Sequence, residues 1–302
     1  MKNIHVAFCF DVNYMKYMLV AAKSIISNNF ESCITFHLVY SDLSEPNKEF
    51  IRKTLEEDCK VFFYDGKGLN IGIKSSNNRY GLAALYRLFL AQLLPNNIKK
   101  VIYLDCDLIV NSDLHELWEY NLEASYLAAV VNLCGKACVE VNLKPSEYFN
   151  SGVLLINLDL WRKTDFSQEI LKFMIAHENK LKYLDQSAMN KILEKKWIKL
   201  PLMWNVQSDT YAYLHKPNSF YSTEEVIFAL QNTKIIHFTG PRKPWHYYSF
   251  HPCKNIYKIQ YSKVFDLPDS NFYIDKNFFS FIKKNLEFKR NLKMIVNRKW
   301  CN

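Results

Sequence analysis

The stretch Val101-Ile-Tyr-Leu-Asp105-Cys-Asp107-Leu-Ile-Val110 decides the fold of this chain. An apolar run typical of a buried strand is interrupted by two aspartates spaced i, i+2, and then resumes. Residues i and i+2 of a strand point to the same side, so we expect the two carboxylates to converge at a strand end. Because two buried and unpaired carboxylates are very costly, the spacing favours a divalent cation between them. The alternative is a loop aspartate followed by a capping aspartate, which needs no metal.

Apolar segments and helical patterns alternate around this stretch. We expect strands over residues 4–10, 35–40 and 61–64, and helices over 15–26, from Ser44, and over 82–94 up to Pro95. This order predicts an α/β fold with a mostly parallel sheet flanked by helices. Ligands of such sheets bind beyond the carboxyl ends of the strands, and Asp11, Asp105 and Asp107 all fall there. No glycine-rich phosphate loop is present in the sequence, so a bound phosphate would be held by metal and isolated donors.

Composition is that of a large globular domain, with 302 residues, 49% hydrophobic and 23% charged. The apolar start, residues 1–10, is too short for a secretory signal, and no run is long enough for a transmembrane helix. We therefore expect a cytoplasmic protein.

The formal net charge of +9 is concentrated near the C-terminus. Within residues 276–302, basic side chains alternate with aromatic and aliphatic ones: Lys276, Phe278, Phe279, Phe281, Lys283, Lys284, Phe288, Lys289, Arg290, Lys293, Arg298, Lys299 and Trp300. The pattern is typical of an amphipathic helix on an anionic membrane surface. We thus predict a globular domain at 1–250 that carries the polar strand ends, and a basic, aromatic helical segment at 251–302 that associates with a membrane surface. A packed C-terminal helix or a nucleic-acid patch are the alternatives, and we expect no nucleic-acid partner.

Two further segments carry polar residues beside apolar ones. Asn150, Ser151 and Gly152 stand just before an apolar run and predict a turn followed by a buried strand. Asp185-Gln186 precedes a helical pattern over 187–195, where Asp185 could be the N-cap.

A single histidine, His237, ends a predicted strand and is followed by Gly240 and Lys243. Such a histidine is often structural. Beside a lysine and a glycine that permits close backbone approach, it indicates a diphosphate and metal subsite.

Taken in order, these segments resemble the retaining glycosyltransferases of family 8, above all the bacterial lipooligosaccharide α-galactosyltransferases. The resemblance covers about residues 4–250. It rests on Phe10-Asp-x-Asn-Tyr14, Tyr103-Leu-Asp-Cys-Asp107, Phe149-Asn-Ser-Gly-Val-Leu-Leu-Ile-Asn157, Asp185-Gln186 and His237-Phe-Thr-Gly-Pro-x-Lys-Pro-Trp245.

The resemblance implies a GT-A fold, a UDP-sugar donor and Mn²⁺, with Mg²⁺ as the alternative ion. Asp105, Asp107 and His237 would ligate the metal. Other residues would bind the donor: Asp11 and Asn13 at uridine and ribose, Cys106 between the two aspartates, Gly240 and Lys243 at the phosphates, and Arg87, Asn150, Gly152, Asp185 and Gln186 around the sugar. Gln186 and Asp185 would be the catalytic candidates.

The chemistry favours a front-side mechanism over a covalent one. Gln186 is a neutral amide and therefore a poor nucleophile. We expect the departing phosphate to deprotonate the acceptor hydroxyl, with retained configuration and no stable glycosyl-enzyme.

The donor sugar and the acceptor are less defined. Asn132 stands where the relatives usually carry an aspartate that touches the sugar, so galactose or glucose remains open. We expect residues 132–147 and 205–235 to shape the acceptor site. The resemblance implies a saccharide or glycolipid acceptor of the lipooligosaccharide or lipopolysaccharide class. Together with the basic C-terminal segment, it implies a cytoplasmic protein that is peripheral on the inner face of the bacterial inner membrane.

Two other functions are less consistent with the sequence. Haloacid-dehalogenase-like phosphatases also use D-x-D and Mg²⁺, but they carry the motif near the chain start and need a later acidic pair. A non-catalytic membrane-surface protein would leave the polar residues at the strand ends unexplained.

Overall fold

A seven-stranded sheet with the order β3-β2-β1-β4-β7-β6-β8 forms the centre of the computed structural model. The structure describes residues 3–57, 59–69, 71–72, 81–133, 136–177, 180–213, 220–247 and 249–265. The strands of the large sheet are β1 Asn3–Asp11, β2 Cys33–Ser41, β3 Lys60–Asp65, β4 Lys100–Leu104, β6 Leu127–Val131, β7 Phe149–Asn157 and β8 Trp197–Lys199. A second sheet of three strands contains β5 Leu108–Val110, β10 Ile235–His237 and β9 Val206–Gln207.

The predicted mostly parallel sheet is confirmed. Strand β1 pairs in parallel with β2 and β4, β2 with β3, and β6 with β8, whereas β7 runs antiparallel to both β4 and β6. Because β1 and β4 are parallel neighbours, Asp11, the last residue of β1, and Asp105, the first residue after β4, lie at one edge of the sheet. Since β7 is antiparallel, its first residues reach the same edge, with Val153 opposite Leu104.

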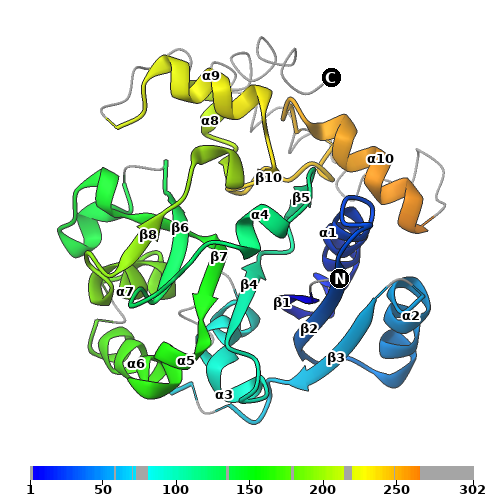
Figure 1. Cartoon of the computed structure of the whole chain (residues 1–302), viewed down its shortest axis with the longest axis horizontal. Helices are drawn as coiled ribbons and strands as arrows, with labels where there is room; N and C mark the ends of the chain where they lie inside the picture. The colour runs from blue at the N-terminus through cyan, green and yellow to red at the C-terminus, as the bar shows by residue number, and fades with distance from the viewer. Residues whose placement is uncertain are drawn as a thin grey trace.

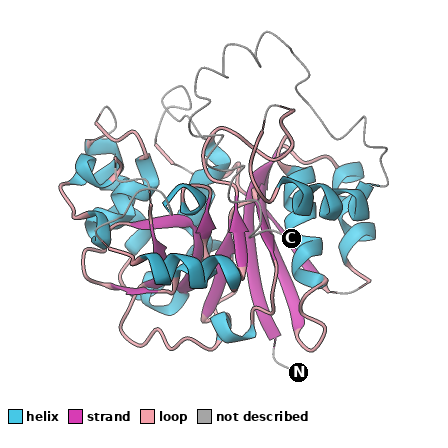
Figure 2. Ribbon diagram, turned by 90° about the horizontal axis from the view of Figure 1, so that it is seen from above, coloured by secondary structure: helices cyan, strands magenta, loops and turns pink. Residues whose placement is uncertain are grey.

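Helices cover both faces of the large sheet (Figures 1 and 2). They are α1 Met15–Ile26, α2 Glu45–Leu55, η2 Leu82–Phe89, α3 Leu90–Leu93, α4 His115–Trp118, η3 Cys138–Val141, η4 Pro145–Glu147, α5 Leu158–Lys163, α6 Phe166–Ala176, α7 Leu184–Ile192, η5 Leu202–Trp204, α8 Thr210–Tyr213, α9 Thr223–Gln231 and α10 Lys254–Phe265. Alternate residues of β1 enter opposite cores, Val6 and Phe8 on one face and Ala7 and Cys9 on the other. Burial on both faces explains why the parallel strands read as continuous apolar runs.

The predicted helix start at Ser44 is confirmed. The Ser44 hydroxyl accepts a hydrogen bond from the Asn47 N–H at 3.4 Å, and Pro46 lies in the first turn of α2. A serine cap with proline at the start of the helix satisfies or removes backbone donors that lack helical partners.

The predicted helix over 82–94 is wrong in type for most of its length. Residues 82–89 form the 3₁₀-helix η2, and only the short α3 is α-helical. Arg87 accounts for part of the difference, because its Nε donates to the Ala84 carbonyl at 2.9 Å. Gly81 enters η2 with φ +79°, a conformation that favours glycine.

The aspartate pair does not lie within one strand. The chain leaves β4 at Leu104, bends through Asp105-Cys106-Asp107, and enters β5 of the small sheet at Leu108. The prediction that both aspartates lie on one side of a single strand is therefore wrong. Strand β4 belongs to the large sheet and β5 to the small sheet, so the chain changes sheets between the two aspartates.

Two other local expectations are also wrong. Asn150, Ser151 and Gly152 lie inside β7 and not in a turn before it, because β6 pairs with β7 as far as Phe149 and the Asp105 N–H donates to the Gly152 carbonyl. Asp185 lies in the first turn of α7, whose N-cap is Tyr183, so Asp185 is not the cap.

Helix α10 packs beside α1 (Figure 1). Tyr257 and Tyr261 of α10 belong to the same buried cluster as α1.

The predicted basic segment at 276–302 lies outside the described residues, so the division at 250 stays a prediction. In the described ranges, every helix is too short or too polar to cross a membrane.

Candidate active site and metal centre

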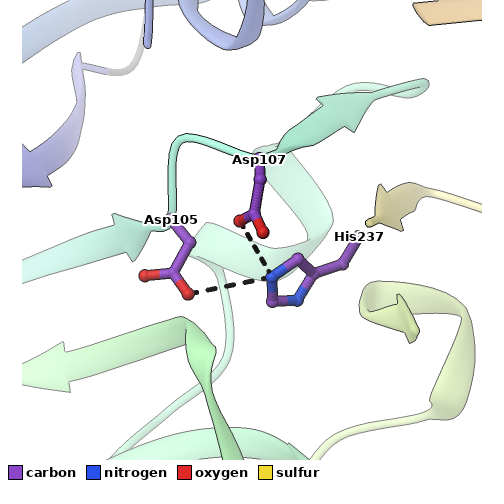
Figure 3. Close-up of side chains that lie close together, drawn as sticks. All are labelled: Asp105, Asp107 and His237. Atoms are coloured by element: carbon purple, nitrogen blue, oxygen red, sulfur yellow. Dashed lines mark hydrogen bonds and ion pairs between the residues drawn. The ribbon is translucent and has the colours of Figure 1, made fainter. Parts of the chain in front are cut away.

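The three predicted metal ligands, Asp105, Asp107 and His237, come together where the two sheets meet (Figure 3). His237 Nε2 lies 3.2 Å from Asp107 Oδ1 and 3.7 Å from Asp105 Oδ2. One ligand atom of each residue lies within 4.8 Å of the others, and this is the cluster of metal-binding type found among the described residues. Side-chain atoms this close to one another can ligate one shared ion.

Strand pairing in the small sheet brings His237 to the aspartates. Strand β10 runs antiparallel to β5, with His237 opposite Leu108. The Phe238 N–H then donates to the Asp107 carbonyl at 2.9 Å. Residues 130 positions apart in the sequence are thus held side by side by backbone hydrogen bonds.

The chemistry of the three side chains fits a divalent cation. His237 Nδ1 lies 3.0 Å from Asn205 Oδ1, so this nitrogen has a partner on the side away from the aspartates. A histidine that donates from one ring nitrogen offers the lone pair of the other to a metal. Two carboxylates and one imidazole suit Mn²⁺ at least as well as Mg²⁺.

Gly152 makes the close packing around the triad feasible. A Cβ atom at this position would lie 2.6 Å from Asp105 Oδ2 and 3.0 Å from His237 Nε2. The Gly152 carbonyl also accepts a hydrogen bond from the Asp105 N–H at 2.8 Å. Any larger residue would therefore occupy the space in which the ligands meet.

Lys243 contacts the triad from the loop after β10. Its Nζ forms an ion pair with Asp107 and donates to the Phe238 carbonyl at 2.8 Å. Burial alone would raise the pKa of Asp107, but the charges of Lys243 and His237 outweigh it and lower that pKa. Gly240, with φ +83°, provides a turn conformation that favours glycine in this loop.

Arg87 connects the metal cluster to the predicted sugar-facing residues. It forms ion pairs with Asp105 at 3.1 Å and Asp185 at 2.8 Å, and it donates to the Ser151 carbonyl at 2.9 Å. Burial raises the pKa of Asp185, although the Arg87 charge opposes it. The guanidinium thus bridges two acids that belong to different parts of the chain.

Gln186 is held by neighbours at both ends of its amide. Its Oε1 accepts from the Ser151 N–H at 3.0 Å and from the Ser151 hydroxyl at 3.1 Å, and its Nε2 donates to the Tyr148 hydroxyl at 3.2 Å. The side chain is therefore fixed against the start of β7.

Glu140, which lies on η3, belongs to none of the motifs that predicted the site. Its Oε2 accepts from the Lys182 N–H at 3.0 Å, the Tyr183 N–H at 3.2 Å and the Ser187 hydroxyl at 3.1 Å. A carboxylate that accepts hydrogen bonds from backbone N–H groups at a helix N-terminus stabilises that end of the helix. Glu140 thus anchors the turn of α7 that carries Asp185 and Gln186.

Replacing Glu140 by alanine should lower the free energy of unfolding by about 1–3 kcal/mol, because two backbone donors lose their acceptor. Urea unfolding followed by circular dichroism measures this. The exposed Glu31 is the control, and its alanine variant should change stability by less than about 0.5 kcal/mol. Equal effects at both positions would contradict the anchoring role.

The remaining predicted residues lie at or near the ends of the first strands. Asp11 lines a cavity of about 480 Å³ together with Ser41, Asp42, Gly66, Lys67, Leu69, Ile71, Gly72, Leu82, Ala83 and Tyr86. Asn13 lies in the exposed turn after Asp11. The Cys106 thiol is buried and donates to the Cys9 carbonyl at 3.8 Å, so its side chain faces the core and not the carboxylates.

The chain is similar in sequence to several bacterial proteins. The chain is 28% identical to general stress protein A of Bacillus subtilis (strain 168) over 271 residues, which are 84% of this chain and 91% of that protein. It is 27% identical to a lipopolysaccharide 1,2-glucosyltransferase of Escherichia coli (strain K12) over 262 residues, 85% of this chain and 77% of the relative.

A solved structure shares the fold. The galactosyltransferase LgtC, crystallised with donor and acceptor sugar analogues, superposes with a TM-score of 0.78 at 24% identity, covering 88% of this chain and 98% of the other. This similarity confirms the GT-A fold. The sequence profile described as glycosyl transferase family 8 matches residues 5–249. The chain therefore belongs to glycosyl transferase family 8.

Proposed function

We propose that this protein transfers galactose or glucose from a UDP-sugar to a saccharide acceptor, with retained anomeric configuration. Mn²⁺, or alternatively Mg²⁺, would be held by Asp105, Asp107 and His237. The observation that carries the proposal is the convergence of these three side chains, with Lys243 beside them, at the carboxyl edge of β4.

The arrangement suits loss of a diphosphate. When the bond to the anomeric carbon breaks, negative charge develops on the β-phosphate. A bound cation would supply Lewis-acid stabilisation of that charge. Lys243 would add a positive charge that becomes available to phosphate once its pairing with Asp107 is relaxed by the ion.

The uridine and the sugar would occupy opposite sides of this centre. The cavity beside Asp11 lies at the ends of β1, β2 and β3 and would take uridine and ribose, with Asn13 in the adjoining turn. Arg87, Asn150, Gly152, Asp185 and Gln186 would surround the sugar. Gly240 in the loop after β10 would let the backbone approach the phosphates.

The mechanism we propose is front-side attack without a covalent intermediate. The Gln186 amide is neutral, and three hydrogen bonds hold it against Ser151 and Tyr148. A group of this kind is a poor nucleophile. Intact-mass measurement after rapid quenching of enzyme with UDP-sugar should show no added hexose. A mass increase mapped to Gln186 or Asp185 would refute the mechanism.

We propose a hexose donor and name galactose and glucose as the two candidates. The relatives described above include a glucosyltransferase and a galactosyltransferase. Asn132 is buried and its Oδ1 accepts from Asn150 Nδ2 at 3.3 Å. This residue is our candidate for reading a sugar hydroxyl, because a buried polar group discriminates strongly between hydroxyl positions.

A UDP-release screen tests the proposal. Purified protein is incubated with UDP-galactose, UDP-glucose and other UDP-sugars, with Mn²⁺ or with EDTA, and free UDP is measured. We expect release from one of the two hexose donors, dependent on the metal. No release from any donor would refute the transferase, and phosphate release from simple esters would favour a phosphatase instead. Acceptor trials with lipooligosaccharide and lipopolysaccharide saccharides would follow, using the best donor.

We also propose, from the sequence of residues 276–302 alone, that the chain binds anionic membrane surfaces at the cytoplasmic face. Co-sedimentation with phosphatidylglycerol vesicles should be strong at low salt and weak at high salt, whereas phosphatidylcholine vesicles should bind little. Replacing Lys283, Lys284, Lys289 and Arg290 by glutamine in the full chain should weaken binding. Unchanged sedimentation of that variant would refute this role.

A further inference from the structure

A row of three buried amide side chains leads away from the metal-binding cluster. His237 Nδ1 lies 3.0 Å from Asn205 Oδ1, Asn205 Nδ2 lies 2.9 Å from Asn150 Oδ1, and Asn150 Nδ2 lies 3.3 Å from Asn132 Oδ1. Asn205 is 0% exposed, Asn150 8% and Asn132 6%. We call Asn132, Asn150 and Asn205 the amide row. It reaches from His237 to the residue that we propose reads the sugar.

A backbone group fixes the direction of every hydrogen bond in the row. The Gly152 N–H donates to Asn150 at 3.0 Å. A backbone N–H can only donate, so the Asn150 atom that faces it must be the amide oxygen. The Asn205 atom that faces the same oxygen must then be the amide nitrogen, which turns the Asn205 oxygen toward His237.

The direction of the hydrogen bonds in the amide row determines which ring nitrogen of His237 carries the proton. An amide oxygen only accepts, so His237 Nδ1 must carry the proton. The lone pair of a neutral imidazole is then on Nε2, which faces Asp105 and Asp107. The opposite tautomer would donate Nε2–H to Asp107 and would offer no ligand to a cation.

We propose that Asn205 is a positioning residue for the metal ligand His237, and that Asn150, oriented by Gly152, sets the direction of the Asn205 amide. This inference rests on the metal site of the proposed function. It adds Asn205, which lies between η5 and β9. Outer-sphere partners of ligating histidines typically change metal affinity about 10- to 100-fold when they are removed.

Mn²⁺ affinity tests the proposal without relying on turnover. The full-length protein is titrated with Mn²⁺ in the presence of UDP, and free Mn²⁺ is followed by electron paramagnetic resonance, with a protein-free titration subtracted. Asn205→Leu, similar in size but without polar atoms, should raise the Kd for Mn²⁺ about 10- to 100-fold. Asn205→Asp should weaken binding clearly less than Asn205→Leu, because its carboxylate still accepts the Nδ1 proton although it can no longer donate to the Asn150 oxygen.

A matched control separates positioning from general loss of stability. Asn29 is also buried and makes hydrogen bonds of 2.8 Å to the Ile25 carbonyl and from the Leu114 N–H. Asn29→Leu should lower stability without changing the Kd for Mn²⁺.

A double-mutant cycle tests the amide row itself. Asn150→Leu should weaken Mn²⁺ binding, and adding it to Asn205→Leu should cause little further loss, because Asn150 acts through Asn205.

Three results would overturn the inference: wild-type affinity in Asn205→Leu, equal weakening in Asn205→Asp and Asn205→Leu, or additive losses in the cycle. If Asn205→Leu does not fold, Asn205→Ser replaces it. Its hydroxyl is too short to accept from His237, so the same loss is expected, and an unchanged Kd would refute the role. A wild-type protein that takes up no Mn²⁺ would instead refute the proposed metal site. Failure of the two proposals is thus distinguishable.

Discussion

Asparagine in place of Asp107 should lower the metal-dependent rate of UDP release about a thousandfold, which corresponds to about 4 kcal/mol of barrier. The substitution keeps the size of the side chain but removes the charge that would hold the cation. It also leaves Lys243 and His237, both in contact with Asp107, without their carboxylate partner. kcat/KM for the best donor measures the effect, and circular dichroism verifies the fold.

The control for this variant makes the same chemical change on the surface. Asp159 forms ion pairs with Lys99 at 3.3 Å and Arg162 at 3.4 Å and is half-exposed. Asp159→Asn should leave UDP release unchanged, since exposed pairs contribute about 0–1 kcal/mol. An Asp107→Asn enzyme that keeps its rate within about tenfold, or 1.4 kcal/mol, would show that Asp107 is not a metal ligand.

Alanine at Gly152 should have the second largest effect, a loss of at least about a hundredfold in metal-dependent UDP release. The added Cβ would lie 2.6 Å from Asp105 Oδ2 and would overlap the His237 ring. Neither neighbour can move freely, because Arg87 and Tyr103 hold Asp105 through its other oxygen and Asn205 holds His237. The ligands would be pushed apart, at an overpacking cost of about 1–3 kcal/mol in stability.

Gly68 offers a matched control for this substitution. A Cβ added there meets no heavy atom within 4 Å. Gly68→Ala should therefore keep both the rate and the Mn²⁺ dependence of the wild type. If Gly152→Ala behaves like Gly68→Ala, the three side chains do not need the space that the glycine leaves.

The regular part of the fold could be predicted because its signals are local. Strands β1, β2 and β3 are apolar runs bounded by polar residues, and helix α2 begins at a serine with a proline behind it. Parallel pairing of β1 with β4 then places Asp11 and Asp105 at one edge, as expected from the strand order alone. Family membership followed from short motifs in a fixed order.

Other parts of the site depend on contacts that no local pattern encodes. The spacing of Asp105 and Asp107 indicated convergence, but the chain changes sheets between them, and β10 decides where they meet. Glu140 and Asn205 have partners more than 30 residues away in the sequence. Arg87 was expected at the sugar, and its ion pairs with Asp105 and Asp185 follow from no local pattern. Such residues become visible only when the elements are packed.

The division of the proposed metal site between two sheets has a consequence for biosynthesis. Asp107 leaves the ribosome 130 residues before His237. A nascent chain can therefore form β1 to β4 while the imidazole ligand is still unmade, and it cannot assemble the cluster until β10 pairs with β5. The enzyme would thus acquire its ion only after β10 is in place, and ion uptake would report that the small sheet has formed.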